Sequence, residues 1–129
     1  MRTILLIIAM VVVSQASTFK YAGKYNLGNS IVEIRDSKHS KGDLSFDFNS
    51  KNNDRDSDCG ASSWILKNQI KNNLVDYRED NGYGMRKAFD LKFTDNAVDI
   101  KFTDQYIADA SCGDGEAKAF SGKFIKIGK

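Results

Sequence analysis

The stretch Phe89-Asp-Leu-Lys-Phe-Thr-Asp-Asn-Ala-Val-Asp-Ile-Lys-Phe102 decides the fold, because apolar and polar residues alternate on both sides of a polar centre. Such alternation indicates β-strands with one buried face. With Asp95-Asn96 as a two-residue turn, the two halves form a hairpin. Apolar residues then pair on one face and opposite charges on the other: Phe93 with Val98, Leu91 with Ile100, Phe89 with Phe102, Lys92 with Asp99, and Asp90 with Lys101. A slip of one residue would turn every side chain to the wrong face, so the pattern specifies this register.

The same reasoning predicts a second hairpin and the remaining strands. A turn at Gly28-Asn29 pairs Tyr25 with Val32 and Lys24 with Glu33. Further runs rich in alternating apolar residues lie at 19–25, 44–48, 62–66, 74–77 and 120–124, with Gly23 and Gly122 inside the first and the last. Together they predict an all-β, antiparallel, eight-stranded meander that forms a small barrel or sandwich. Because so many Phe residues point inward, we expect its interior to be filled.

Length and charge limit the functions that this chain can have. Its 129 residues suffice for one small core. Nineteen basic side chains stand against 17 acidic ones, and the formal net charge is +2. Without a strongly basic field, a dedicated nucleic-acid binder is disfavoured.

The first sixteen residues have the three parts of a secretory signal. Met1-Arg2 gives a positive start, residues 4–13 are apolar, and Ser14-Gln15-Ala16 offers small residues to a signal peptidase. The apolar run is about half of the roughly 20 residues that cross a bilayer. We therefore expect cleavage after residue 16, with residues 17–129 forming one β-barrel domain that is secreted or periplasmic and has no membrane attachment.

Two cysteines in an exported chain predict one disulfide, Cys59 to Cys112. Closing a loop of that size would stabilise the fold by roughly 3–4 kcal/mol. A metal site would need more Cys or His residues nearby, and the only histidine is His39. We therefore predict a structural bond and no metal bound by these cysteines.

No pattern assembles a catalytic or cofactor site. His39 lies in a polar connection without an acidic residue beside it, and no nucleophile elbow, zinc helix or phosphate loop is present. Asp54, Asp56 and Asp58 alternate as in a calcium loop, but Cys59 and Ile65 occupy the positions where such a loop needs Gly and Glu. We expect neither an enzyme nor a cofactor, and leave open whether this acidic loop binds a cation.

Three long connections, residues 36–43, 50–60 and 104–116, are the places where binding is expected on a rigid barrel. The disulfide would tie the second to the third. The residues that we select as binding candidates come from the third connection, from the closing strand and from a Gly-flanked tip: Ser111, Gly113, Asp114, Ser121, Lys123 and Tyr83.

The layout of the chain resembles the small exported bacterial β-barrels that include the periplasmic lysozyme inhibitors. It shares the signal peptide, the opening Gly-Lys-Tyr at 23–25, the all-β meander, one disulfide and a closing Ser-Gly-Lys-Phe at 121–124. Those inhibitors carry a Ser-Gly-x-x-Tyr loop. Here Ser121-Gly122 is followed by Lys123 and then Phe124, so the aromatic residue comes one position earlier than the Tyr of that motif and has no hydroxyl. The Gly-Lys-Tyr opening is also similar to the Gly-x-Trp of calycin barrels, such as lipocalins and avidins.

These observations leave two functional hypotheses. The first is a monomeric binding protein that recognises a protein partner through its loops, a lysozyme being the partner that the resemblance implies. The second is a small-ligand carrier that uses the barrel interior, with Tyr21, Tyr25 and Trp64 as its lining.

Overall fold

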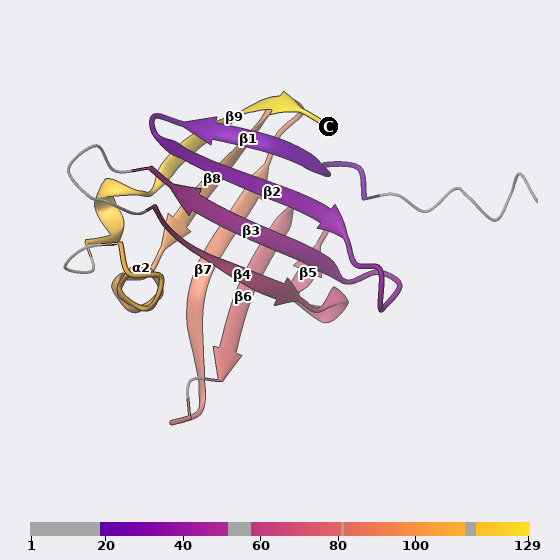
Figure 1. The fold of residues 1–129 in the computed structure, drawn as a ribbon. Coiled ribbons are helices and arrows are strands. Elements are labelled where there is room, and N and C mark those ends of the chain that lie inside the picture. Colours follow the sequence, from indigo (N-terminus) through magenta and orange to yellow (C-terminus); the bar gives the residue numbers. More distant parts are fainter. Residues whose placement is uncertain (1–18, 52–57, 81, 113–115) are drawn as a thin grey trace, which may run out of the picture.

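The computed structural model describes residues 19–51, 58–80, 82–112 and 116–129. These residues form an all-β protein, a single antiparallel sheet of nine strands that curls into a nearly closed barrel (Figure 1). The strands are β1 (Gly23–Leu27), β2 (Ser30–Asp36), β3 (Leu44–Ser50), β4 (Cys59–Ile65), β5 (Ile70–Lys71), β6 (Leu74–Asp80), β7 (Met85–Phe93), β8 (Ala97–Phe102) and β9 (Gly122–Gly128). Three short helical segments join them: η1 (Lys67–Gln69), α2 (Asp104–Asp109) and η2 (Ala117–Ala119).

Both predicted hairpins are confirmed residue by residue. In β1–β2, Tyr25 pairs with Val32 and Lys24 with Glu33. In β7–β8, all five predicted pairs are present, from Phe93 opposite Val98 to Phe89 opposite Phe102. The alternation of buried and exposed residues therefore set the register correctly, because one face of each strand must be buried.

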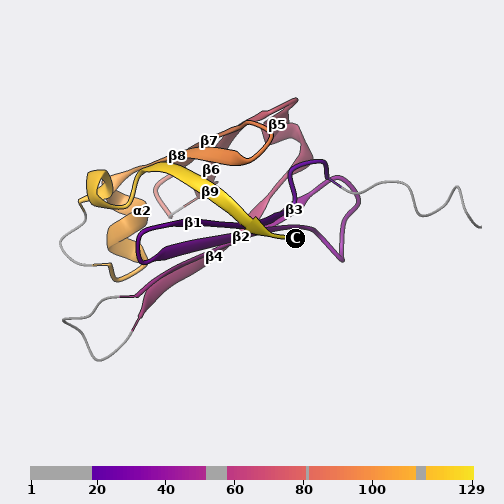
Figure 2. The same cartoon turned by 90° about the horizontal axis from the view of Figure 1, so that it is seen from above.

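The sheet folds over into two layers. Its strand order is β4-β3-β2-β1-β9-β8-β7-β6-β5. Figure 2 shows β1 to β4 in one layer and β7 and β8 in the other, with β9 crossing from one to the other. The edges of the sheet are β4 and β5. The ninth strand, β5, was not predicted because its two residues cannot show an alternating pattern.

Aromatic rings fill the space between the layers, as expected. Phe46 from the first layer stacks on Phe89 from the second, with ring centroids 4.4 Å apart. Tyr77 stacks on Phe89 at 4.7 Å, and Phe102 stacks on Tyr106 at 5.5 Å. Such contacts add stability beyond the burial of apolar area. The centre of the barrel is therefore a packed aromatic core.

Two predicted strands begin later than expected. The first starts at Gly23, and Phe19 precedes it in a turn where the Asp36 carboxylate accepts the hydrogen bond of its backbone N–H at 3.0 Å. The last starts at Gly122, whereas Phe120 ends the helical turn η2. At Gly23 a Cβ atom would lie 2.6 Å from the Gly128 carbonyl oxygen, and φ is +154°. The glycine thus allows β1 and β9 to approach closely.

The predicted loop 104–116 contains a helix, which corrects the sequence interpretation. The Thr103 hydroxyl accepts a hydrogen bond from the Tyr106 N–H at 3.3 Å and so caps the start of α2. The helix turns Tyr106 and Ile107 into the core. It lies at one open end of the two layers (Figure 2).

The predicted disulfide is confirmed. Cys59, the first residue of β4, is bonded to Cys112, which follows α2, and their Cα atoms are 5.2 Å apart. Both side chains are buried. The bond therefore fixes an edge strand of the sheet to the helical end of the barrel. Within the described ranges, no helix has the length and apolar character needed to cross a bilayer.

Candidate recognition surface at the β6–β7 hairpin and α2

The β6–β7 hairpin extends beyond the rest of its sheet. Strand β8 pairs with β7 only from Phe89 to Phe93. The first residues of β7, from Met85 to Lys87, pair with β6 alone. Figure 1 shows this two-stranded ribbon projecting below the barrel. A bulge in the ladder between Tyr77 and Arg78 marks the level at which the ribbon leaves the barrel.

The tip of this ribbon carries exposed apolar side chains. Tyr83 is 87% exposed and Met85 is 60% exposed. The flanking Gly82 and Gly84 have positive φ angles, and a Cβ atom at either position would meet nothing within 4 Å. Tyr83 thus stands on a segment with a glycine on either side, and most of its side chain is exposed to solvent.

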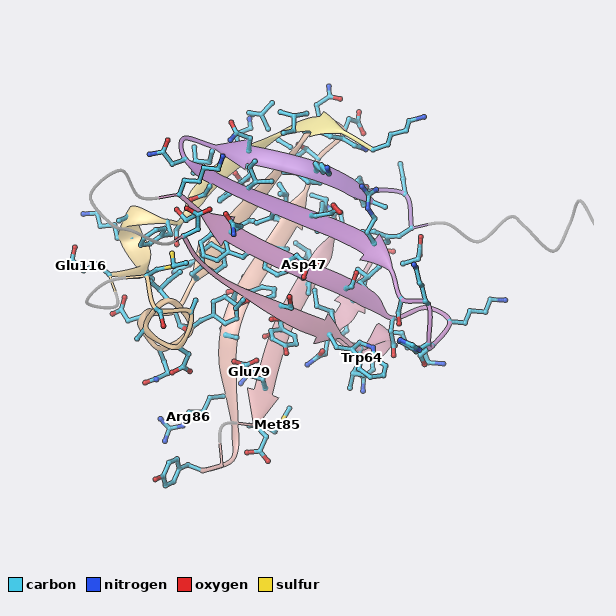
Figure 3. All side chains as sticks on the ribbon, viewed as in Figure 1. Asp47, Trp64, Glu79, Met85, Arg86 and Glu116 are labelled. Carbon is cyan, nitrogen blue, oxygen red and sulfur yellow. A yellow bond between two sulfur atoms is a disulfide. The ribbon has the colours of Figure 1, made fainter. Side chains whose placement is uncertain are left out.

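A groove separates the ribbon from α2. Its outer part has a volume of about 440 Å³ and is lined by Tyr83, Arg86, Gln105 and Asp109. A narrower part of about 70 Å³ continues from the same Arg86, Gln105 and Asp109 inward. We call the two parts the hairpin–helix groove, whose lining consists of Glu79, Tyr83, Arg86, Lys87, Ala88, Thr103, Gln105, Tyr106 and Asp109. Figure 3 shows Glu79, Arg86 and Met85 together at this end of the molecule.

The groove carries both signs of charge, and two buried phenols lie close to it: Tyr106 in its lining and Tyr77, which is bonded to Glu79. Arg86 and Lys87 lie along the groove with Glu79 and Asp109. The pKa of Tyr77 is raised to about 12, mainly by burial. The Glu79 carboxylate, which accepts the hydrogen bond of the Tyr77 hydroxyl at 3.1 Å, raises it further. Burial likewise raises the pKa of Tyr106, whose hydroxyl shares a 2.9 Å hydrogen bond with Ser63. Both phenols stay protonated at neutral pH, so they act as fixed hydrogen-bonding groups and do not supply a base.

The structure brings one of the predicted binding residues into this groove, Tyr83. Ser111 is exposed and follows α2 with a φ of +64°, where the chain turns toward Cys112. Gly113 and Asp114 lie outside the described residues. Lys123 is exposed on β9 and pairs with Asp99.

Ser121, another of the predicted binding residues, is hydrogen-bonded within the fold. Its hydroxyl donates to the Ala117 carbonyl at 2.8 Å and accepts from the Phe102 N–H at 3.0 Å. These bonds join η2 to the end of β8. Ser121 therefore has a structural role between two elements, just before β9 begins.

The three residues expected to line a ligand-binding interior do not form such a lining. Tyr25 is fully buried, and its hydroxyl donates to the Tyr21 carbonyl at 2.7 Å. Tyr21 stacks on Phe93 at 5.0 Å. Trp64 points away from the barrel and is 52% exposed. The carrier hypothesis thus loses the residues that supported it.

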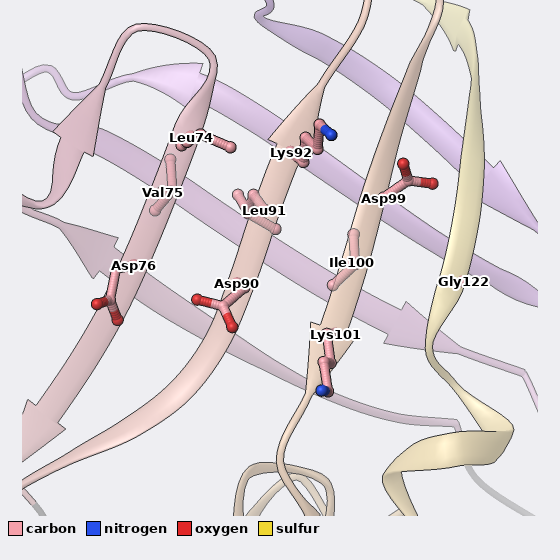
Figure 4. Close-up of a pocket in the computed structure, with 10 residues that line it drawn as sticks. All are labelled: Leu74, Val75, Asp76, Asp90, Leu91, Lys92, Asp99, Ile100, Lys101 and Gly122. Carbon is pink, nitrogen blue, oxygen red and sulfur yellow. The ribbon is translucent and has the colours of Figure 1, made fainter.

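A second hollow lies on the outer face of β6, β7 and β8 (Figure 4). Its volume is about 390 Å³. The carboxylates of Asp76 and Asp90 lie on paired residues there, and Lys87 approaches both, at 3.5 and 2.8 Å. Arg78 lies 3.3 Å from Asp76. These carboxylates are already paired with cations, so they are not free to bind a ligand or a metal ion.

Sequence reasoning missed Met85, Arg86, Gln105 and Asp109. Gln105 and Asp109 belong to α2, which was read as loop, although Tyr106, Ile107 and Ala110 have helical spacing after the cap at Thr103. Of the predicted acidic loop, Asp54 and Asp56 lie outside the described residues. Among the residues that the structure does describe, no group of three His, Cys, Asp or Glu side chains is placed to hold a metal ion.

Comparisons with protein families, curated proteins and solved structures found no match to this chain.

Proposed function

We propose that this protein is an exported recognition module that binds another protein at the hairpin–helix groove. The observation that carries the proposal is the exposure of Tyr83 and Met85 on a ribbon that projects beyond its sheet. Leaving these side chains in water costs free energy that a partner would recover. Tyr, Met and Arg are also the residue types enriched at protein interfaces, and Arg86 is adjacent.

The base of the ribbon supports a defined binding geometry. Phe89 holds β7 in the core through its contacts with Phe46 and Tyr77. On the other side of the groove, α2 is anchored by Tyr106 and by the disulfide at Cys112. Both walls therefore start from the packed core, which lowers the entropy lost when a partner is bound.

A lysozyme is the partner class that we propose first, because the layout of the chain resembles that of the lysozyme inhibitors. Blocking an enzyme requires an element that protrudes into its cleft. Ser121 is unsuited to this because its hydroxyl is bonded inside the fold. The tip from Gly82 to Met85 lies on the projecting ribbon, and it combines small residues with an exposed aromatic ring.

Calorimetric titration of residues 17–129 against c-, g- and i-type lysozymes tests the proposal. We expect one class to bind with a dissociation constant below about 1 μM, equivalent to roughly 8 kcal/mol, and to lose muramidase activity. Truncating a central aromatic anchor typically costs at least about 2 kcal/mol, so Tyr83→Ala should weaken binding by roughly 30-fold.

Leu74→Ala is the matched control, because Leu74 is similarly apolar and exposed but lies on the outer face of β6, away from the groove. It should bind as the wild type does. Absence of binding to all three classes would remove lysozyme as the partner. Binding that Tyr83→Ala and Met85→Ala both leave unchanged would remove the groove as the site.

A further inference from the structure

The single tryptophan of the chain lies at a second, separate site. Arg35 on β2 pairs with Ser45 on β3, and Ser45 pairs with Trp64 on β4. The three side chains therefore form one row on the outer face of three neighbouring strands. Because strands lie about 4.8 Å apart, Arg35 and Trp64 are separated by roughly 10 Å, with only the small Ser45 between them. The row forms a depression with a cation at one end and an indole at the other.

The indole ring is held in a fixed orientation. Its Nε1–H donates to Asp43 Oδ2 at 3.0 Å, and the other oxygen of Asp43 accepts the Lys67 N–H at 2.8 Å. Asp43 is only 5% exposed. The polar edge of Trp64 is thereby used inside the protein, and the exposed half of the side chain remains for contact with a ligand.

The connection between β2 and β3 forms the wall of this depression. His39 approaches Trp64 with ring centroids 6.5 Å apart and planes tilted by 50°. The hollow is open to solvent on one side and has a volume of about 350 Å³, within the range of small-ligand sites. We call it the Trp64 hollow, whose lining consists of Arg35, Asp36, Ser37, Lys38, His39, Leu44, Ser45 and Trp64. It shares no residue with the hairpin–helix groove, and Figure 3 shows Trp64 well apart from Met85 and Arg86.

The lining contains many hydrogen-bonding groups but little net charge. The cations Arg35 and Lys38 are matched by Asp36 in the lining and by Glu33, which lies 3.5 Å from Arg35. A strongly charged ligand would therefore gain little from this surface. The hydroxyls of Ser37 and Ser45, the imidazole of His39 and the Arg35 guanidinium, which already donates one bond to the Lys129 carbonyl at 2.7 Å, can instead form hydrogen bonds with an uncharged ligand that has many hydroxyls.

We propose that the Trp64 hollow binds an uncharged saccharide, with one pyranose ring packed flat against the exposed face of Trp64. A pyranose with equatorial hydroxyls has two apolar C–H faces and a polar rim. The faces match the indole, and the rim meets the side chains of Arg35 and Ser45. A nucleotide would also stack, but its phosphate would need an excess of cations that this lining does not have.

Tryptophan fluorescence tests this site directly, because Trp64 is the only tryptophan in the protein. The probes are cellohexaose and chitohexaose, both β-linked chains of rings with equatorial substituents. We expect a saturable change in emission with at least one of them, with a dissociation constant on the order of 0.1–1 mM, as suits one stacked ring with a few hydrogen bonds. AMP serves as the anionic stacking ligand and should bind at least tenfold more weakly.

Two variants distinguish the loss of saccharide binding from the loss of the folded structure. Ser45→Leu fills the centre of the hollow while keeping the Trp64 reporter, and should weaken saccharide binding by at least tenfold. Its matched control is Asn49→Leu, which adds the same side chain on the same face of β3 outside the hollow. Trp64→Ala, followed by calorimetry, should abolish binding. The proposal is overturned if neither hexasaccharide changes the emission at about 10 mM, if Ser45→Leu binds as tightly as Asn49→Leu, or if AMP binds more tightly than both saccharides.

Discussion

Replacing both cysteines, Cys59→Ala with Cys112→Ala, should cost more stability than any surface change in this protein. The disulfide joins residues 53 positions apart. In the loop-entropy description, removing a cross-link of that span raises the conformational entropy of the unfolded chain. The free energy of unfolding falls by about 4 kcal/mol as a result. Because both sulfur atoms are buried, the small cavities left by alanine add to the loss with the same sign. A small domain has only about 5–15 kcal/mol in total, so the variant should be marginally folded.

Urea unfolding followed by far-UV circular dichroism measures this loss. The wild type treated with a reductant should show a somewhat smaller shift in midpoint than the double variant, because its buried sulfur atoms remain and no cavity forms. Amide exchange should accelerate most at the start of β4, because this edge strand has a ladder only to β3 and its first residue is held by the bond at Cys59. A loss below about 1 kcal/mol in both samples would refute the claim that the bond restrains the unfolded chain.

Three further predictions concern the core, a helix cap and one carboxylate. Phe89→Ala should cost about 3–5 kcal/mol in urea unfolding, because the ring is fully buried against Phe46 and Tyr77; a loss under about 1 kcal/mol would mean that the site repacks. Thr103→Ala should cost about 1 kcal/mol through the lost cap of α2, whereas an unchanged midpoint would show that the cap carries no stability. The Lys67 N–H, the main cause, holds the pKa of Asp43 below its usual 3.8. The folded state therefore binds this proton more weakly than the unfolded state. The resulting stability is present above the unfolded pKa and is lost as the pH falls through the folded pKa. Asp43→Asn should reduce the acid-induced drop in urea midpoint below about pH 4, and an identical acid profile would contradict this account.

Strand pairing was predictable wherever two independent patterns agreed. In β7–β8 the apolar pair Leu91–Ile100 and the charge pair Lys92–Asp99 specify the same register. At the closing run only one pattern existed, the even spacing that places Phe120 and Phe124 on one face with Gly122 between them. Phe120 fits that spacing but ends a helical turn, because Gly122 allows the chain to change direction between Phe120 and Phe124.

The outward position of Trp64 could have been read from strand parity. Cys59 and Ile65 are both buried in β4 and are six positions apart in sequence, so they share one face of the strand. Trp64, which is next to Ile65, must lie on the opposite face. Large aromatic residues usually favour burial, and that expectation misplaced it. The partner that holds it, Asp43, lies 21 positions away, and no local pattern indicates their contact.

The hairpin–helix groove could be predicted only in part. The Gly-flanked Tyr83 was recognisable as an exposed tip. Its neighbours across the groove, Gln105 and Asp109, come from a six-residue helix that is too short to show clear periodicity. The position of that helix beside the ribbon depends on the burial of Tyr106 and Ile107 and on the disulfide, which are properties of the whole fold.

The most direct test of the central claim is an NMR titration of isotope-labelled protein, residues 17–129, with the lysozyme class that gives the strongest calorimetric signal. The account predicts that the largest amide shift changes fall on two segments, 82–87 and 104–109, which form the two walls of the groove. Shift changes concentrated on the outer faces of β2, β3 or β9, or no changes with any lysozyme class at saturating concentration, would contradict it.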